Sequence, residues 1–310
     1  MGSKRKLSKT IIDYILIHNP NVKYIYDLFG GGGSMSFEAL QRKQIKKVFY
    51  NELNTGVTEL LKHIRDNGIT PEMYRWVSRD EFNECKTNND WWGGFIKTCW
   101  SFGNNQEDYL FGKEIEKTKQ LAHEVVINNC NISLSKLIEI TGVEIPYNIH
   151  DLKDIHEKRK YLTKIFKREK RIELQQLQQL QQLQQLQQLQ QLQRLQQLER
   201  LQQLERLQQL EISNKSFNEV QITTPINETI IYLAPPYLGT RSYQENEDNL
   251  HNKINDYIKN SPYKIYISSY EWNDLTIVKE ISHRSILSAT ANNKIVERLF
   301  CNQKEFVKNT

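Results

Sequence analysis

Residues 22–34 read Val-Lys-Tyr-Ile-Tyr-Asp-Leu-Phe-Gly-Gly-Gly-Gly-Ser, a largely apolar run that ends in four consecutive glycines. The pattern predicts a β-strand over 22–29, followed by a tight glycine turn. A helical patch over 36–42 and a second strand over 47–51 come next. A strand, a glycine turn, a helix and a second strand in this order are typical of the start of a parallel α/β sheet. The stretch therefore predicts an α/β fold.

The rest of the sheet is predicted from the other end of the chain. A helical stretch over 7–18 precedes the first strand, and a helix is expected over 247–259. Strand-like runs in the C-terminal segment cover 229–234, 263–270, 280–286 and 296–301. We therefore expect one sheet built from both ends of the chain, with residues 76–172 as an insertion.

Between these parts lies a low-complexity repeat. From Leu174 to Leu210 a leucine occupies every third position, thirteen in all, separated mainly by glutamine, glutamate and arginine. These residues favour helix, but a period of three drifts by about 60° per triplet around a helix of 3.6 residues per turn, so no lasting apolar stripe forms. We predict a helical spacer. A partner-binding arm, self-association through the repeat and a β-solenoid stay open.

Composition excludes several classes of protein. The 310-residue chain is 38% hydrophobic and 25% charged, with a net charge of +5, and its apolar runs are too short for a membrane span. No apolar signal region follows the basic N-terminus, so we expect a soluble, intracellular protein. The four cysteines form no CxxC pair and the seven histidines show no metal-ligand spacing, so no metal site is expected.

The glycine turn is the first candidate binding site. Glycines after a strand allow a ligand to approach the backbone closely, and the next helix offers free N–H groups. The turn is not a Walker loop and lacks the dinucleotide-binding spacing. Glu52 ends the second strand, where an acidic side chain commonly binds a ribose diol. A turn needed only for geometry and a solvated glutamate are the alternatives.

The second candidate site is Ile230-Ile231-Tyr232-Leu233-Ala234-Pro235-Pro236-Tyr237. Two consecutive prolines fix an extended backbone directly after a strand, which would present Tyr237 at the carboxyl edge of the sheet. Ligands of α/β proteins bind at that edge. A stiff strand exit without a ligand is the alternative.

Together these motifs resemble the DNA adenine methyltransferases of the Dam type, including many phage and prophage enzymes. The resemblance covers essentially the whole chain. It rests on D-x-F-x-G-x-G at 27–33, the acidic strand end at Glu52 and x-P-P-Y at 234–237. Further matches are Gly2-Ser3-Lys4, Trp100-Ser101-Phe102-Gly103-Asn104-Asn105, Ile267-Ser268-Ser269-Tyr270 and Leu287-Ser288-Ala289-Thr290.

The resemblance implies a Rossmann-like class I methyltransferase fold that uses S-adenosylmethionine, without metal, to methylate the N6 amine of adenine in double-stranded DNA. It implies a catalytic domain in two parts, 1–75 and 211–310, a mostly helical target-recognition region at 76–173 and the repeat spacer at 174–210. We correspondingly expect a site-specific enzyme of a bacterial or phage-infected cell, close to the nucleoid. It would act either alone or in a restriction–modification system. The implied cofactor-binding residues are Lys4, at the methionine end, Asp27, Phe29, Gly31, Gly33 and Glu52, at the ribose.

The chain departs from the family pattern at Ala234. The family signature is D-P-P-Y, and its aspartate accepts a hydrogen bond from the target amine. Alanine offers no acceptor, and losing one charge-assisted bond costs about 2–4 kcal/mol, a factor of 30 to 1,000 in rate. We therefore expect this chain to be inactive in methyl transfer, either through an engineered change or as a natural pseudoenzyme that only binds DNA.

The remaining motif residues keep their implied roles. Tyr237 would stack on an adenine flipped out of the duplex, Pro235 would offer its carbonyl to the amine, and Pro236 would hold the turn. For DNA contact we expect the basic run that begins at Lys158 and the loop that follows Trp100, although a solvated helix face and a structural loop are the alternatives. The expected DNA-binding residues are Lys158, Arg159, Lys160, Lys164, Lys167, Arg168, Ser101, Asn104 and Asn105.

Overall fold

A computed structural model describes residues 4–102, 105–176, 206–236, 247–273, 275–284 and 294–303. The chain divides into two compact units. The sheet unit contains Met1–Arg65 and Leu204–Thr310, and the helical unit contains Asp66–Gln203. The two ends of the chain thus build one unit, and the stretch between them builds the other.

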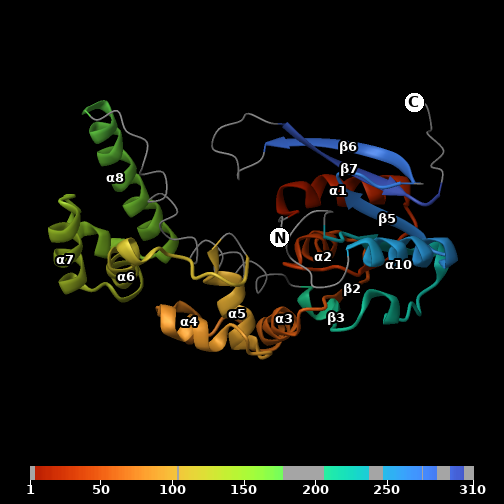
Figure 1. The fold of residues 1–310 in the computed structure, drawn as a ribbon, viewed down its shortest axis with the longest axis horizontal. Coiled ribbons are helices and arrows are strands. Elements are labelled where there is room, and N and C mark those ends of the chain that lie inside the picture. The colour runs from red at the N-terminus through yellow and green to blue at the C-terminus, as the bar shows by residue number, and fades with distance from the viewer. Residues whose placement is uncertain are drawn as a thin grey trace. The chain divides into compact units, whose positions relative to one another are not determined.

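A seven-stranded sheet forms the centre of the sheet unit, in the order β3-β2-β1-β4-β5-β7-β6 (Figure 1). The strands from β3 to β5 pair in parallel, whereas β7 is antiparallel to both β5 and β6. This mixed sheet with helices confirms the predicted α/β, Rossmann-like class I methyltransferase fold. The bounds of the strands are β1 Tyr24–Asp27, β2 Lys47–Asn51, β3 Leu210–Ser213, β4 Thr229–Leu233, β5 Lys264–Ser269, β6 Thr276–Arg284 and β7 Lys294–Cys301.

Helices cover both faces of the sheet. On one face α10 (Glu247–Asn260) buries Ile254 and Ile258 against the inward side chains of β1, β4 and β5. On the other face α2 (Ser34–Leu40) packs against β1 and β2, and α1 (Arg5–His18) packs against α2. In Figure 1 α10 runs beside β5, and α1 lies close to β6 and β7. The helix α3 (Thr55–Asn67) follows β2.

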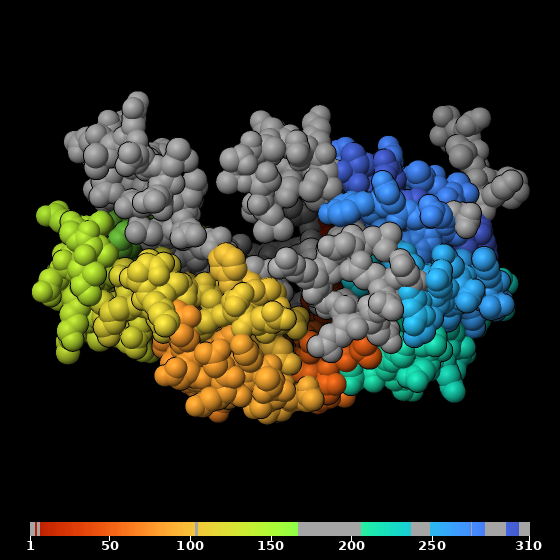
Figure 2. Space-filling view, viewed as in Figure 1, coloured from red at the N-terminus to blue at the C-terminus, as the bar shows by residue number. Residues whose placement is uncertain are grey.

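The helical unit packs around aromatic side chains. Trp100 is buried, and Trp76 lies edge-on to it with ring centroids 5.1 Å apart. Phe102, by contrast, is 47% exposed. Figure 2 shows the surface of these helices in orange to green. Their bounds are α4 Arg79–Cys85, α5 Trp91–Cys99, α6 Lys113–Asn128, α7 Asn131–Thr141 and α8 Ile155–Gln176, with short 3-10 turns at Pro71–Tyr74 and Tyr147–Asp151.

The two ends of the leucine repeat belong to ordinary structure. Its first triplet continues α8, and 177–205 lie outside the described residues. At the other end, Leu207 is buried in a 3-10 turn and Leu210 is the buried first residue of β3. The prediction of a uniform spacer up to 210 was therefore wrong at its end, because a leucine that continues the triplet pattern also fits a buried strand. Among the described residues, no helix has the length and apolar character needed to cross a membrane.

Candidate active site

The glycine turn lies between the carboxyl end of β1 and the start of α2. The Gly33 N–H donates to the Gly30 carbonyl at 2.8 Å, and the Gly30 N–H donates to the Asn51 carbonyl at 2.8 Å. Gly31 and Gly33 have φ angles of 49° and 73°, in the left-handed region that favours glycine. The turn thus has a fixed shape tied to the end of β2.

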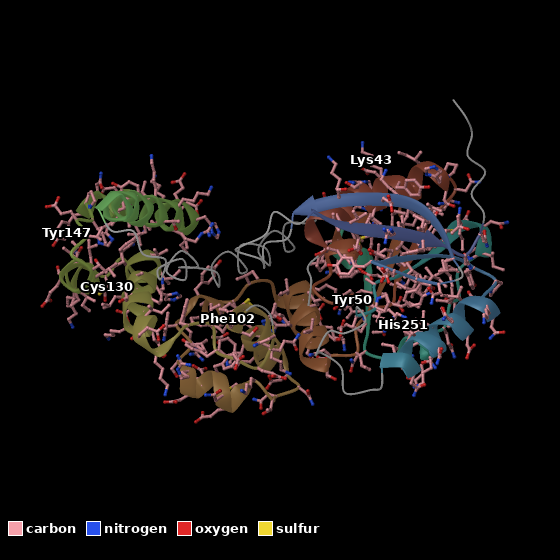
Figure 3. All side chains as sticks on the ribbon, turned by 45° about the horizontal axis from the view of Figure 1, so that its top comes forward. Lys43, Tyr50, Phe102, Cys130, Tyr147 and His251 are labelled. Atoms are coloured by element: carbon pink, nitrogen blue, oxygen red, sulfur yellow. The ribbon has the colours of Figure 1, made fainter. Side chains whose placement is uncertain are left out.

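Tyr50, near the end of β2, packs against this turn. Its hydroxyl donates to the Gly31 carbonyl at 2.6 Å, and its ring leaves no room for a side chain at Gly30, where a Cβ would lie 2.1 Å from the ring. Figure 3 shows Tyr50 among the strands of the sheet unit. Sequence reasoning assigned Tyr50 no role, since an aromatic residue in a strand is ordinary core material.

Asp27 ends β1 directly beneath the turn and is 1% exposed. Its Oδ2 atom accepts a 2.7 Å hydrogen bond from the Ser36 hydroxyl, whereas Oδ1 is buried with no partner among the described residues. Burial raises the pKa of Asp27 to about 7, although the bonds from Ser36 oppose the rise. Asp27 therefore presents a desolvated oxygen that can accept from a bound cation.

Glu52 closes the other side of the turn. Its Oε2 atom accepts from the Gly31 N–H at 2.8 Å, and Oε1 accepts from the Asn54 N–H at 2.9 Å. Burial raises the pKa of Glu52, and these backbone donors oppose the rise. In the unliganded protein Glu52 therefore holds the backbone of the turn. Phe29 lies nearby but stacks on Phe217, with ring centroids 5.2 Å apart.

Lys4 caps the start of α1 and forms an ion pair with Glu297 of β7. Glu297 is 1% exposed and also accepts a 2.6 Å hydrogen bond from the Ser268 hydroxyl of β5. Burial lowers the pKa of Lys4, and the Glu297 carboxylate counteracts that effect. In this structure the Lys4 ammonium is thus bound to a carboxylate that sequence reasoning did not single out.

The carboxyl end of β4 brings the second motif to the same edge of the sheet. Leu233 pairs with Ile267 in parallel register, so Ala234 follows beside Ser268. Ala234 is half-buried and Pro235 is buried. Because parallel strands place their carboxyl ends at one edge, the x-P-P-Y strand exit and the glycine turn adjoin. Tyr237 lies outside the described residues.

The profile of the D12 class N6 adenine-specific DNA methyltransferase family matches residues 1–295 of the chain. The chain belongs to this family. Membership confirms the resemblance to the Dam-type enzymes and places the chain among the adenine-specific DNA methyltransferases. No curated protein matches the chain.

A D12 class methyltransferase uses S-adenosylmethionine, and the residues of the turn fit that cofactor. The unpartnered Asp27 oxygen suits a cationic amino group. Among the residues that the structure describes, none apart from its chain neighbours lies within 4 Å of a Cβ built at Gly32, so the outer side of the turn is open. In the described ranges no group of three or more acidic, histidine or cysteine side chains is arranged to hold a metal ion.

The basic residues expected at the DNA lie on α8 and differ in their surroundings. Lys158 is 4% exposed and donates to Asn129, so its ammonium stabilises the helical unit. Arg159 is half-buried, whereas Lys160 and Lys164 are exposed. The side chains of Lys167 and Arg168 lie outside the described residues.

The loop after Trp100 is held by its own polar groups. The buried Ser101 hydroxyl donates to the Lys97 carbonyl at 2.5 Å. Asn105 is exposed, and its side-chain amide donates to Asp108 at 2.6 Å while its oxygen accepts from the backbone N–H of Glu107 and Asp108. In this state the Ser101 side chain therefore maintains the loop. Asn104 lies outside the described residues.

Proposed function

We propose that this D12 class methyltransferase binds S-adenosylmethionine at the glycine turn and a flipped adenine at the exit of β4, with Ala234 suppressing the transfer itself. The buried, unpartnered Asp27 oxygen next to an open glycine turn carries the proposal. The cofactor, when bound, supplies an electrophilic methyl group on a sulfonium. Asp27 would then accept from the amino group of the cofactor. Glu52 would release one backbone N–H and bind the ribose of the cofactor instead.

The groups that the chain places around the target amine explain why we expect a low rate of methyl transfer. Pro235 has a carbonyl that can accept a hydrogen bond from one N–H of the amine, and the prolines keep this backbone extended. Ala234 has only a methyl group where a carboxylate would accept a hydrogen bond from the other N–H and enrich the nitrogen lone pair. Electrostatic stabilisation of this kind is worth roughly 2–4 kcal/mol in the transition state.

DNA is expected to reach this site through the helical unit. We propose that the exposed cations Lys160 and Lys164, with the half-buried Arg159 beside them, contact phosphates, because the two lysines are exposed whereas Lys158 is buried. Asn105 would read a base edge only after releasing Asp108. Contact by Lys167, Arg168 and Asn104 is part of the same proposal.

The test is transfer of labelled methyl groups to mixed-sequence duplex DNA by this chain and by Ala234→Asp. We expect Ala234→Asp to raise the rate of N6 labelling by about 30- to 1,000-fold, because the carboxylate restores the missing acceptor. Ala234→Val, which adds volume without an acceptor, is the matched control and is expected to stay at the level of this chain.

Two results would contradict the proposal. Equal labelling by this chain and by Ala234→Asp would show that residue 234 does not limit transfer. No labelling by any variant, with DNA binding intact, would favour a pseudoenzyme that occupies DNA sites without methylating them.

A further inference from the structure

Lys4, Glu297 and Ser268 form a buried polar group that joins three elements of the sheet unit. Lys4 comes from the start of α1, Ser268 from β5 and Glu297 from β7. The Glu297 carboxylate receives both the Lys4 ammonium and the Ser268 hydroxyl. The side chain of Lys4 is 12% exposed and that of Glu297 is 1% exposed, so water shields this pair little.

The strand register places this group at the edge of the sheet that holds the candidate site. Because β7 is antiparallel and Arg298 pairs with Ser269, the last residue of β5, Glu297 lies just beyond the carboxyl end of β5. Ser268 lies beside Ala234 by continuation of the β4–β5 register. Thus Glu297 is separated from the exit of β4 by a single strand.

The same face of the sheet also carries Asp27. Asp27 pairs with Tyr232, and successive residues alternate between faces, so Asp27, Tyr232, Ala234 and Ser268 share one face. Burial raises the pKa of the Tyr232 phenol well above its ordinary value, Ser268 opposes the rise, and the negative charges of Asp27 and Glu297 add to it. Tyr232 thus lies within the electrostatic reach of both carboxylates.

The charge of the ligand determines how the pair of Lys4 and Glu297 would affect binding. S-adenosylmethionine carries a positive sulfonium, whereas its demethylated product is a neutral thioether. An uncompensated ammonium at this edge would oppose the sulfonium but not the thioether. Between unit charges within about 10 Å of each other, in an effective dielectric near 20, such opposition is worth roughly tenfold or more in affinity.

We propose that Glu297 is a positioning and specificity-determining residue that neutralises Lys4, so that the site accepts the sulfonium cofactor in preference to its thioether product. This inference rests on the proposed cofactor site at the glycine turn. It adds a role for β7, which contributes neither the glycine turn nor the x-P-P-Y motif. The preference follows from charge balance and needs no contact between Glu297 and the ligand.

The test is calorimetric measurement of the dissociation constants for S-adenosylmethionine and for S-adenosylhomocysteine at pH 6.5 and at pH 5.5, because burial lowers the pKa of Lys4 and the lower pH favours its ammonium form. Glu297→Gln is expected to weaken binding of the sulfonium about tenfold more than binding of the thioether. Lys4→Met is expected to move the ratio of the two constants in the opposite direction. The double variant Lys4→Met/Glu297→Gln is expected to return the ratio near its starting value.

The matched control is Glu228→Gln. Glu228 also forms an ion pair with a lysine, Lys23, but this pair is more exposed and lies at the opposite edge of the sheet, where β1 and β4 begin. It is expected to leave the ratio unchanged. If Glu297→Gln does not fold, Lys4→Met and the double variant still test the direction of the shift.

The outcomes separate this inference from the proposed function. Equal weakening of both ligands by Glu297→Gln, or an unchanged ratio in Lys4→Met, would overturn the inference and reduce the ion pair to a structural role. Failure of both ligands to bind any variant, including the unaltered chain and Glu228→Gln, would overturn the proposed cofactor site itself.

Discussion

Single glycines in the turn after β1 have different structural demands, although the sequence shows four identical residues. At Gly33 a Cβ would lie 2.0 Å from the ring of Phe37, and the φ angle is 73°. At Gly32 a Cβ would meet nothing within 4 Å. Substitution by alanine should therefore lower the stability of the protein at Gly33 and leave it almost unchanged at Gly32.

Gly33→Ala is expected to lower the free energy of unfolding by about 1–3 kcal/mol, because it combines a left-handed backbone with a collision. Gly32→Ala is the matched control and should stay within about 0.5 kcal/mol. Urea unfolding of both variants measures the difference. Equal losses would show that the turn does not hold the described conformation.

The buried carboxyl of Asp27 gives stability a specific dependence on pH. Its pKa is about 7 in the folded protein against 3.8 as the ordinary value, so the folded state binds a proton more tightly than the unfolded state does. The resulting stabilisation is fully present below about pH 4 and is lost as the pH rises through about 7. At about 1.4 kcal/mol per pKa unit, this stabilisation amounts to roughly 4 kcal/mol.

Asp27→Asn should therefore reduce the loss of stability between pH 4 and 7. Unfolding by urea at pH 5 and pH 8, for this chain and for the variant, measures the change. Glu228→Gln, at the opposite edge of the sheet where β1 and β4 begin, is a suitable control in the same unit. An identical pH profile for Asp27→Asn and the unaltered chain would contradict the assignment of this titration to Asp27.

At the level of elements, the end of the leucine repeat is anchored by one arginine. The Arg206 guanidinium donates to the carbonyls of Arg42, at 2.7 Å, of Leu40, at 3.4 Å, and of Ile45. Leu40 is the last residue of α2, and Arg42 and Ile45 follow it, so the guanidinium lies at the carboxyl end of a helix, which favours a positive charge. Arg206 thereby fixes the chain just before β3 enters the sheet.

Arg206→Met is expected to destabilise the sheet unit by about 2 kcal/mol, because three carbonyls lose a charged donor. The stability of Arg206→Lys should lie between that of Arg206→Met and that of the unaltered chain, since one ammonium cannot reproduce the planar fork of donors of a guanidinium. Thermal unfolding checks the order. A methionine variant as stable as the unaltered chain would show that this anchor contributes nothing.

Some elements could be predicted from sequence, and others could not, for definable reasons. The strands near 24–27 and 47–51 are apolar runs flanked by turn residues, so local pattern identifies them. β3 was missed because Leu210 and Ile212 continue a leucine-rich segment that reads as helix. In the site, glycines and Asp27 were found from their motif, whereas Tyr50 and Glu297 were missed, since only strand pairing brings them to the turn and to Lys4.

On the scale of the whole molecule, the repeat joins two units with separate cores. Arg206 and β3 lie beyond the triplets 177–204, and the glycine turn lies wholly within the sheet unit. Deleting 177–204 is therefore expected to leave S-adenosylmethionine affinity within about twofold. Calorimetry on the deletion variant tests this, with Arg206→Met as a comparison in which the sheet unit itself is perturbed. Loss of cofactor binding on deletion alone would assign the repeat a part in that site.

The ion pair between Lys4 and Glu297 joins residues 293 positions apart in sequence. During synthesis the ribosome must therefore release the whole stretch from Lys4 to Glu297 before the two side chains can meet. Until then the growing chain holds the glycine turn and the x-P-P-Y exit without β7, the strand whose Glu297 neutralises Lys4. A premature stop codon before β7 would thus yield a product with both recognisable motifs and an incomplete cofactor site.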